Sequence, residues 1–144
     1  MDHQKDLEVV EKHHVHIDGD SLFVTTRGTV TLEDLKQLME FQYRVRTAHG
    51  MLFVLFDGRQ GTGIDPDVRR YTVADRERYV ADLYVAFGVP FALRIVINMM
   101  DRANALLGRK YSPLRMFDKE EDARRFFEEE RTRLRRTLAS RKLR

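Results

Sequence analysis

The alternation of apolar and polar residues predicts a β-hairpin near the start of the chain. Short alternating segments lie on either side of Asp18-Gly19, a dipeptide that suits the positive backbone angles of a tight turn. We expect strands at residues 13–17 and 22–27. Alternate side chains of each strand then point to opposite faces of a sheet.

The next segment has a helical period. Thr31 occupies an N-cap position, and Asp34 follows at the spacing of a capping box. Apolar residues recur on one broad arc, with charged residues opposite. This pattern predicts an amphipathic helix that extends to about Ala48.

A central strand and a second helix are predicted after it. Residues 51–56 are apolar without alternation, which predicts a strand at 51–57 that is covered on both faces. The sequence "GRQGTG" follows, and we interpret residues 58–64 as a loop between strand and helix. Asp65 as N-cap and Pro66 at the first helical position predict a helix that can extend to Phe87. Such a helix would exceed the usual length in globular proteins, so an internal break is an alternative.

The remaining segments continue the alternation of strands and helices. We expect a strand at 91–98, a short helix at 101–107, a short strand in "SPLRMF" and a last helix from Asp118. A hairpin followed by such alternation predicts an α/β fold with a mixed, mostly parallel sheet.

The length of 144 residues fits a single domain. We expect an N-terminal extension at 1–12, the domain itself at 13–131, and a basic helix end or tail at 132–144. The chain has no cysteine, which excludes disulfides, thiolate metal ligands and a cysteine nucleophile. Its charged start and the lack of a long apolar run predict a cytoplasmic protein without a membrane span.

The candidate chemistry is sparse. The three glycines of "GRQGTG" fit neither common phosphate-binding fingerprint, and the acidic residues after them would repel a phosphate. No serine lies in a G-x-S-x-G motif. His14 and His16 would lie on one face of a strand, where two imidazoles could share a metal, but no third ligand is evident and we interpret them as part of an exposed polar edge strand. We therefore expect no enzyme, no cofactor and no metal.

Thr62 is the hydroxyl residue of the glycine segment. It could be an exposed phosphoacceptor with Arg59 as the partner of the phosphate, or it could simply fill a turn. Arg69 and Tyr71 on the following helix are residue types that protein interfaces favour. The basic C-terminal segment could attract nucleic acid, or it could be a solvated helix end.

The hairpin, the helix "TLEDLKQLMEF", the strands "MLFVLFDG" and "FALRIVINMM", and the ending "LRMFDKEEDARRFFEEE" together resemble the STAS domain. The resemblance is to the branch of anti-sigma factor antagonist-like proteins, also described as STAS/SEC14-like, and covers residues 14–131. In partner-switching members, a strand ends in an aspartate and the next loop carries a phosphorylatable serine. Here Asp57 ends the strand, and Thr62 and Gly63 match part of that turn, whereas its Asp-Ser pair is missing.

The resemblance implies a non-enzymatic regulatory or protein-interaction module of bacterial signalling. Thr62 is the candidate phosphoacceptor, and the implied partner or ligand surface consists of Asp57, Arg59, Thr62, Asp65, Arg69 and Tyr71. The expected partner is a protein, which includes a homodimer. The alternative is a carrier or sensor of an apolar small ligand, as the SEC14-like resemblance and the Met and aromatic residues of "VADLYVAFGVPF" and "INMM" suggest. Nucleic-acid binding through the basic tail is a third, weaker alternative.

Overall fold

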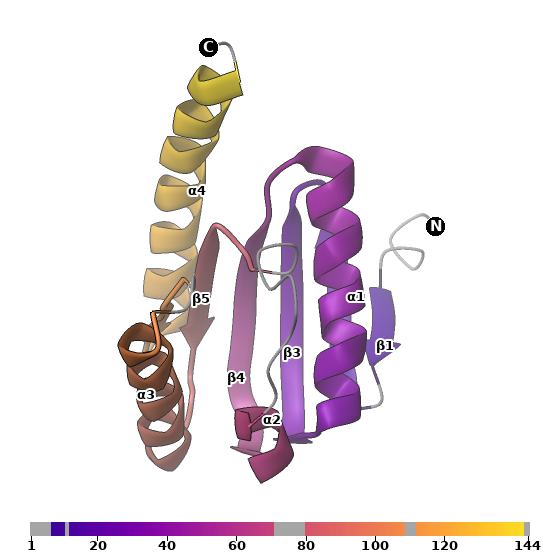
Figure 1. Ribbon diagram of the computed structural model, residues 1–144, viewed down its shortest axis with the longest axis vertical. Coiled ribbons are helices and arrows are strands. Elements are labelled where there is room, and N and C mark those ends of the chain that lie inside the picture. Colours follow the sequence, from indigo (N-terminus) through magenta and orange to yellow (C-terminus); the bar gives the residue numbers. More distant parts are fainter. Residues whose placement is uncertain (1–6, 11, 71–79, 109–111, 143–144) are drawn as a thin grey trace.

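The computed structural model describes residues 7–10, 12–70, 80–108 and 112–142 (Figure 1). Six strands form one sheet in the order β1-β2-β3-β4-β5-β6. The β1–β2 and β2–β3 pairs are antiparallel, and the three later pairs are parallel. The strands are β1 (Leu7–Val10), β2 (His13–Asp18), β3 (Ser21–Val30), β4 (Phe53–Ile64), β5 (Leu83–Phe87) and β6 (Leu114–Phe117). The predicted fold class, α/β with a mixed and mostly parallel sheet, is confirmed.

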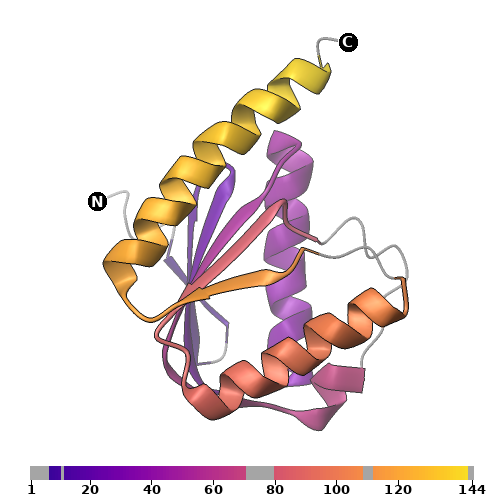
Figure 2. The ribbon, with the colours of Figure 1, turned by 90° about the vertical axis from the view of Figure 1, so that its left-hand side faces the viewer.

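Helices cover both faces of this sheet. Seen from the side, α4 lies on one face, and α1, α2 and α3 lie on the other (Figure 2). Their bounds are α1 (Leu32–His49), α2 (Pro66–Arg70), α3 (Phe91–Leu106) and α4 (Glu120–Lys142). Each parallel pair of strands is thus joined by a segment that contains a helix, which is the connection that parallel pairing requires.

Alternate residues of β4 divide the core into two clusters. Val54 points toward α1, where it belongs to a cluster with Phe41 and Val45 of that helix. Phe53 belongs to the cluster on the opposite face, together with Phe127 of α4. These side chains are almost completely removed from water. The lack of alternation in residues 51–56 reflects this burial on both faces, as the sequence predicts.

The start of α1 is fixed as predicted. The Thr31 hydroxyl accepts the Asp34 N–H at 3.1 Å, and the Asp34 carboxylate accepts the Thr31 N–H at 3.0 Å. The buried ring of His13 also binds this carboxylate at 3.0 Å. Burial by itself would raise the pKa of Asp34, but the hydrogen bonds from Thr31 and His13 outweigh it and lower the pKa. The same carboxylate thus caps α1 and ties that helix to β2.

The glycine segment is not the predicted loop. β4 continues without a break from Phe53 to Ile64, and its second half pairs in parallel with residues 27–30 of β3. Two register shifts in this pairing mark bulges or other irregularities of the ladder. The prediction of a loop at 58–64 is therefore wrong, because backbone pairing with β3 outweighs the turn preference of glycine.

Two further elements differ from the prediction. α2 comprises Pro66–Arg70, and residues 83–87 form β5 rather than the end of one long helix. Residues 71–79 of the predicted helix lie outside the described residues. The strand predicted at 91–98 is the first half of α3. Residues 83–87 and 91–98 are short apolar runs, a pattern that is found both in buried strands and in buried helices. Their packing in the folded protein decides which of the two forms. The predicted order of alternating strands and helices still holds.

The N-terminal hairpin lies inside the sheet. Its turn contains Gly19 in the left-handed region (φ +59°), as Asp18-Gly19 predicts. β1, formed by residues of the expected N-terminal extension, pairs with β2. The interpretation of His14 and His16 as part of an edge strand is therefore wrong, since β2 has a neighbour on each side.

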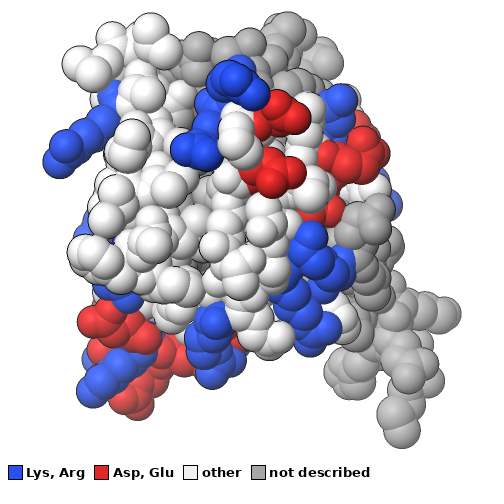
Figure 3. Space-filling view, turned by 90° about the horizontal axis from the view of Figure 1, so that it is seen from below, with Lys and Arg blue, Asp and Glu red and all other residues white. Residues whose placement is uncertain are grey.

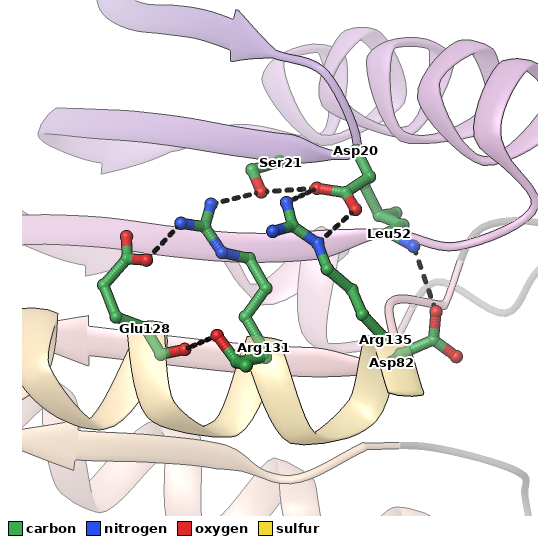
Figure 4. Close-up of polar contacts among 8 residues, drawn as sticks. Asp20, Ser21, Leu52, Asp82, Glu128, Arg131 and Arg135 are labelled. Atoms are coloured by element: carbon green, nitrogen blue, oxygen red, sulfur yellow. Dashed lines mark hydrogen bonds and ion pairs between the residues drawn. The ribbon is translucent and has the colours of Figure 1, made fainter. Parts of the chain in front are cut away.

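Two arginines of α4 bind the sheet at the start of β3 (Figure 4). The Arg135 guanidinium donates to both carboxylate oxygens of Asp20, at 2.8 and 2.6 Å. Arg131 donates to the Ser21 hydroxyl at 2.7 Å, and this hydroxyl donates to Asp20 at 2.9 Å. Burial alone would raise the pKa of Asp20, but the hydrogen bonds from Arg135 and Ser21 outweigh it and lower the pKa. Part of the basic C-terminal segment therefore holds α4 on the sheet.

We expect Arg135→Gln to lower the free energy of unfolding by about 1 kcal/mol, because it removes a bidentate, partly exposed ion pair. The melting temperature then falls by about 2–5 °C. Arg136→Gln is the matched control, because Arg136 is an exposed neighbour on the same helix. Because the pKa of Asp20 is lowered in the folded protein, its ion pair contributes to the free energy of unfolding at pH values above 3.8, the ordinary pKa of the group. This contribution is lost as the pH falls through the lowered pKa. The prediction is wrong if both variants melt like the wild type at pH 7.

Candidate functional site

A cavity of about 290 Å³ lies between α3 and the sheet. This volume is close to the lower limit of about 300 Å³ for small-molecule sites. Most of its wall is apolar, and the wall comes from five elements that are distant in the sequence. The described residues that form its apolar wall are Val30, Phe56, Ile64, Val80, Tyr84, Ala86, Val89, Leu93, Ile97, Met100 and Leu114. Such a site can bind a small apolar molecule.

The glycines of β4 form one side of this cavity. Gly58, Gly61 and Gly63 all line it, together with Gly28 of β3. A Cβ atom at Gly58 would lie 2.7 Å from Cγ2 of Val89, and one at Gly61 would lie 3.5 Å from Cδ2 of Leu93. Glycine therefore lets the start of α3 approach the strand closely while leaving space beneath the rest of the helix.

α3 is apolar on both its inner and its outer face. Leu93 and Ile97 face the cavity, whereas Phe91, Ile95 and Met99 are exposed, with 77%, 47% and 62% of their surfaces accessible. No residue of α3 is fully buried. Seen from below, the end of the molecule that contains α2 and α3 has a wide uncharged middle with charged residues around it (Figure 3). Among the described helices, none has the length and apolarity of a membrane span.

Among the described residues that line the cavity, Asp101 of α3 is the single acidic group. Removal from water raises the pKa of this carboxyl, although a hydrogen bond from the backbone N–H of Leu114 partly opposes the shift. In the sequence, Asp101 follows "INMM" and carries no motif. The one available signal is that Asp101 follows Ile97 by four residues, the spacing at which two residues share a helix face. This signal is lost when residues 91–98 are predicted to be a strand.

Asp57 and Arg59, two residues of the expected partner surface, form a pair. Arg59 donates to the two carboxylate oxygens of Asp57, at 3.0 and 2.7 Å, and lies over the Phe87 ring at 5.2 Å. It also approaches Glu120 of α4 at 3.5 Å. Burial alone would raise the pKa of Asp57, but the hydrogen bonds and charge of Arg59 outweigh it and lower the pKa. The pair therefore lies at the start of α4.

The other members of the expected surface lie farther along the chain. The exposed Thr62 hydroxyl is 3.2 Å from that of Thr29 on β3. The backbone N–H of Asp65 donates to Val30 at 3.0 Å, and its carbonyl accepts the N–H of Val68, so that it starts α2 as predicted. Arg69 is exposed on α2, on the α1 side of the sheet. Tyr71 lies outside the described residues.

The remaining candidates have structural contacts. His14 binds the Arg27 guanidinium at 3.0 Å, and the His16 ring lies 5.9 Å from that of Phe23. Within the described part of the chain, no group of three His, Cys, Asp or Glu residues has a geometry that could hold a metal ion.

No protein-family model and no curated protein matches this sequence. Among solved structures, the chain is similar to the anti-sigma factor antagonist SpoIIAA in its unphosphorylated form, with 12% identity over 90% of this chain and 96% of that chain, and a TM-score of 0.46. It is also similar to an uncharacterized protein of the DUF3478 family from Shewanella loihica PV-4, described as having a SpoIIAA-like fold. That match has 15% identity over 78% of this chain and 89% of that chain, and a TM-score of 0.48.

We expect Gly58→Ala to destabilise the protein by about 1–3 kcal/mol, because the new methyl group would overlap Val89 and force it away from β4. Gly63→Ala is the control, since its Cβ would meet nothing closer than 3.7 Å. Chemical denaturation followed by circular dichroism measures both variants. Equal stability of the two variants would contradict the close contact between β4 and the start of α3.

Proposed function

We propose that this protein is a non-enzymatic, STAS-like module that carries or senses a small apolar ligand in the cavity beneath α3. The observation that supports this proposal is the cavity itself, a space of about 290 Å³ whose wall is mainly apolar. Burial of apolar ligand surface in such a space contributes about 25 cal/mol per Å². α3 forms one wall of the cavity and also presents exposed apolar residues on its outer face. A ligand beneath this helix would therefore contact the same element that is exposed to a partner, which supports a regulatory role.

We expect Ile97→Trp to abolish binding of naphthylmethanol, a neutral apolar probe, because the larger ring would occupy the cavity. Ile95→Trp is the matched control: it changes the same residue type on the outer face of the same helix, where 47% of the side chain is accessible. Isothermal titration calorimetry measures the binding. Native mass spectrometry of the gently purified wild type tests in addition for a ligand that is retained from the cell.

A folded Ile97→Trp protein that binds the probe as the wild type does would contradict the proposal, as would a wild type that binds no probe. Circular dichroism establishes that each variant is folded. If Ile97→Trp does not fold, Leu93→Phe fills the same cavity with a smaller change of volume.

A second candidate function is docking of a protein partner on the exposed surface at Asp57, Arg59 and Thr62 of β4, the part of the expected partner surface that lies on this strand. The observation that favours it is the state of Arg59, whose side chain is 58% exposed although Asp57 holds it in place. An arginine that is fixed before binding loses little conformational freedom at an interface, where arginine contributes strongly to affinity. Thr62 is the proposed phosphoacceptor of this surface.

We expect Arg59→Ala to reduce recovery of a specific partner from the native host at least tenfold, whereas Arg136→Ala, an exposed arginine on α4, leaves recovery unchanged. Quantitative mass spectrometry of the recovered proteins measures this difference and detects phosphate on Thr62. A partner set that is identical for the wild type and both variants would exclude Arg59 from the interface.

A further inference from the structure

The hydroxyl groups in the cavity wall already have partners within the protein. Thr26 donates to the carbonyl of Asp57 at 3.2 Å, Ser112 donates to the carbonyl of Ala81 at 2.7 Å, and Tyr84 donates to the Gln42 side chain at 2.7 Å. Each hydroxyl has a single proton to donate. These three groups therefore have no donor left for a ligand.

Asp101 differs from these groups in its hydrogen-bonding capacity. An ionised carboxylate offers about four acceptor positions, and the backbone N–H of Leu114 uses one of them. The carboxyl is also partly removed from water by the apolar wall around it. A carboxylate in such surroundings is stabilised when an opposite charge or a strong donor takes the place of the lost water.

We propose that Asp101 selects the ligand, which has an apolar body and a single protonated amine that donates to this carboxylate. The inference rests on the proposed function, because it assigns the polar end of the molecule that the cavity holds. An amine both satisfies the acceptor capacity of Asp101 and compensates its charge. A ligand with a carboxylate at the same position would be repelled by Asp101, so fatty acids and other organic anions are excluded as the ligand class.

Three probes with the same aromatic body test this assignment: naphthylmethylamine, naphthylmethanol and naphthoate. A hydrogen bond to a charged group contributes about 1.5–3 kcal/mol. We therefore expect the amine to bind the wild type at least about tenfold more tightly than the alcohol, and naphthoate to bind most weakly. Isothermal titration calorimetry at pH 7 gives the three dissociation constants.

Asp101→Asn is the informative variant, because it retains the shape of the side chain and an oxygen that can accept the Leu114 N–H, while it removes the charge. We expect the amine and the alcohol to bind this variant within about threefold of each other, because the preference for a cation depends on the charge of Asp101. Asp122→Asn on α4, across the sheet from the cavity, is the control and keeps the preference of the wild type. Asp101→Ala serves as a second variant if Asp101→Asn does not fold.

The outcomes separate this inference from the function on which it rests. If the wild type binds the amine and the alcohol equally, or if Asp101→Asn retains the preference for the amine, Asp101 does not select the ligand, while the apolar site itself stands. If the folded wild type binds none of the three probes, the proposed function fails and the inference fails with it. A preference for the amine that Asp101→Asn removes and Asp122→Asn retains supports both.

Discussion

The close contact between the glycine half of β4 and the turn before α3 is the constraint on which the rest of the structure depends. At Gly58 a side chain would overlap Val89, and at Gly88 (φ +69°) a side chain would lie 2.3 Å from Arg59. A Cβ atom at Gly58 would also lie 3.3 Å from the carbonyl oxygen of Phe87 and from Cα of Val89, so β4 and the β5–α3 turn approach each other closely. This contact places the first turn of α3 directly over the strand and determines the direction in which the helix leaves the sheet.

The same constraint explains why the cavity lies under α3 and not under the other long helices. α1 and α4 pack on large side chains of the sheet, such as Val54 and Phe53, and bury Phe41 and Phe127 in return. α3 instead faces Gly61 and Gly63, which have no side chains to fill the space. Protein interiors are usually packed densely. A space remains under α3 because glycine has no side chain that could pack against the helix. The ion pair of Arg135 with Asp20 and the hydrogen bond of Arg131 to Ser21 hold α4 on the opposite face, away from the cavity.

The candidate site could not have been assembled from the sequence. Its wall combines residues of β3, β4, β5, α3 and β6, and parallel crossovers bring these elements together across the sheet. Asp101 has no motif around it, and its role depends on being on the inner face of a helix where a strand was expected. By contrast, Asp57 and Arg59 are two residues apart and form a local pair, so short spacing in the sequence was enough to bring them together.

The sequence by itself determined the hairpin around Gly19, the capped start of α1 at Thr31 and the order of alternating strands and helices, because each depends on local backbone preference or on a regular apolar period. Tertiary structure alone decided that "GRQGTG" continues β4 and that "FALRIVIN" is helical. Glycine permits many backbone conformations, so pairing with β3 selects the extended one. An apolar run without a period fits a strand or a helix, so the position of α3 over the glycines, with apolar residues on both faces, settles its form.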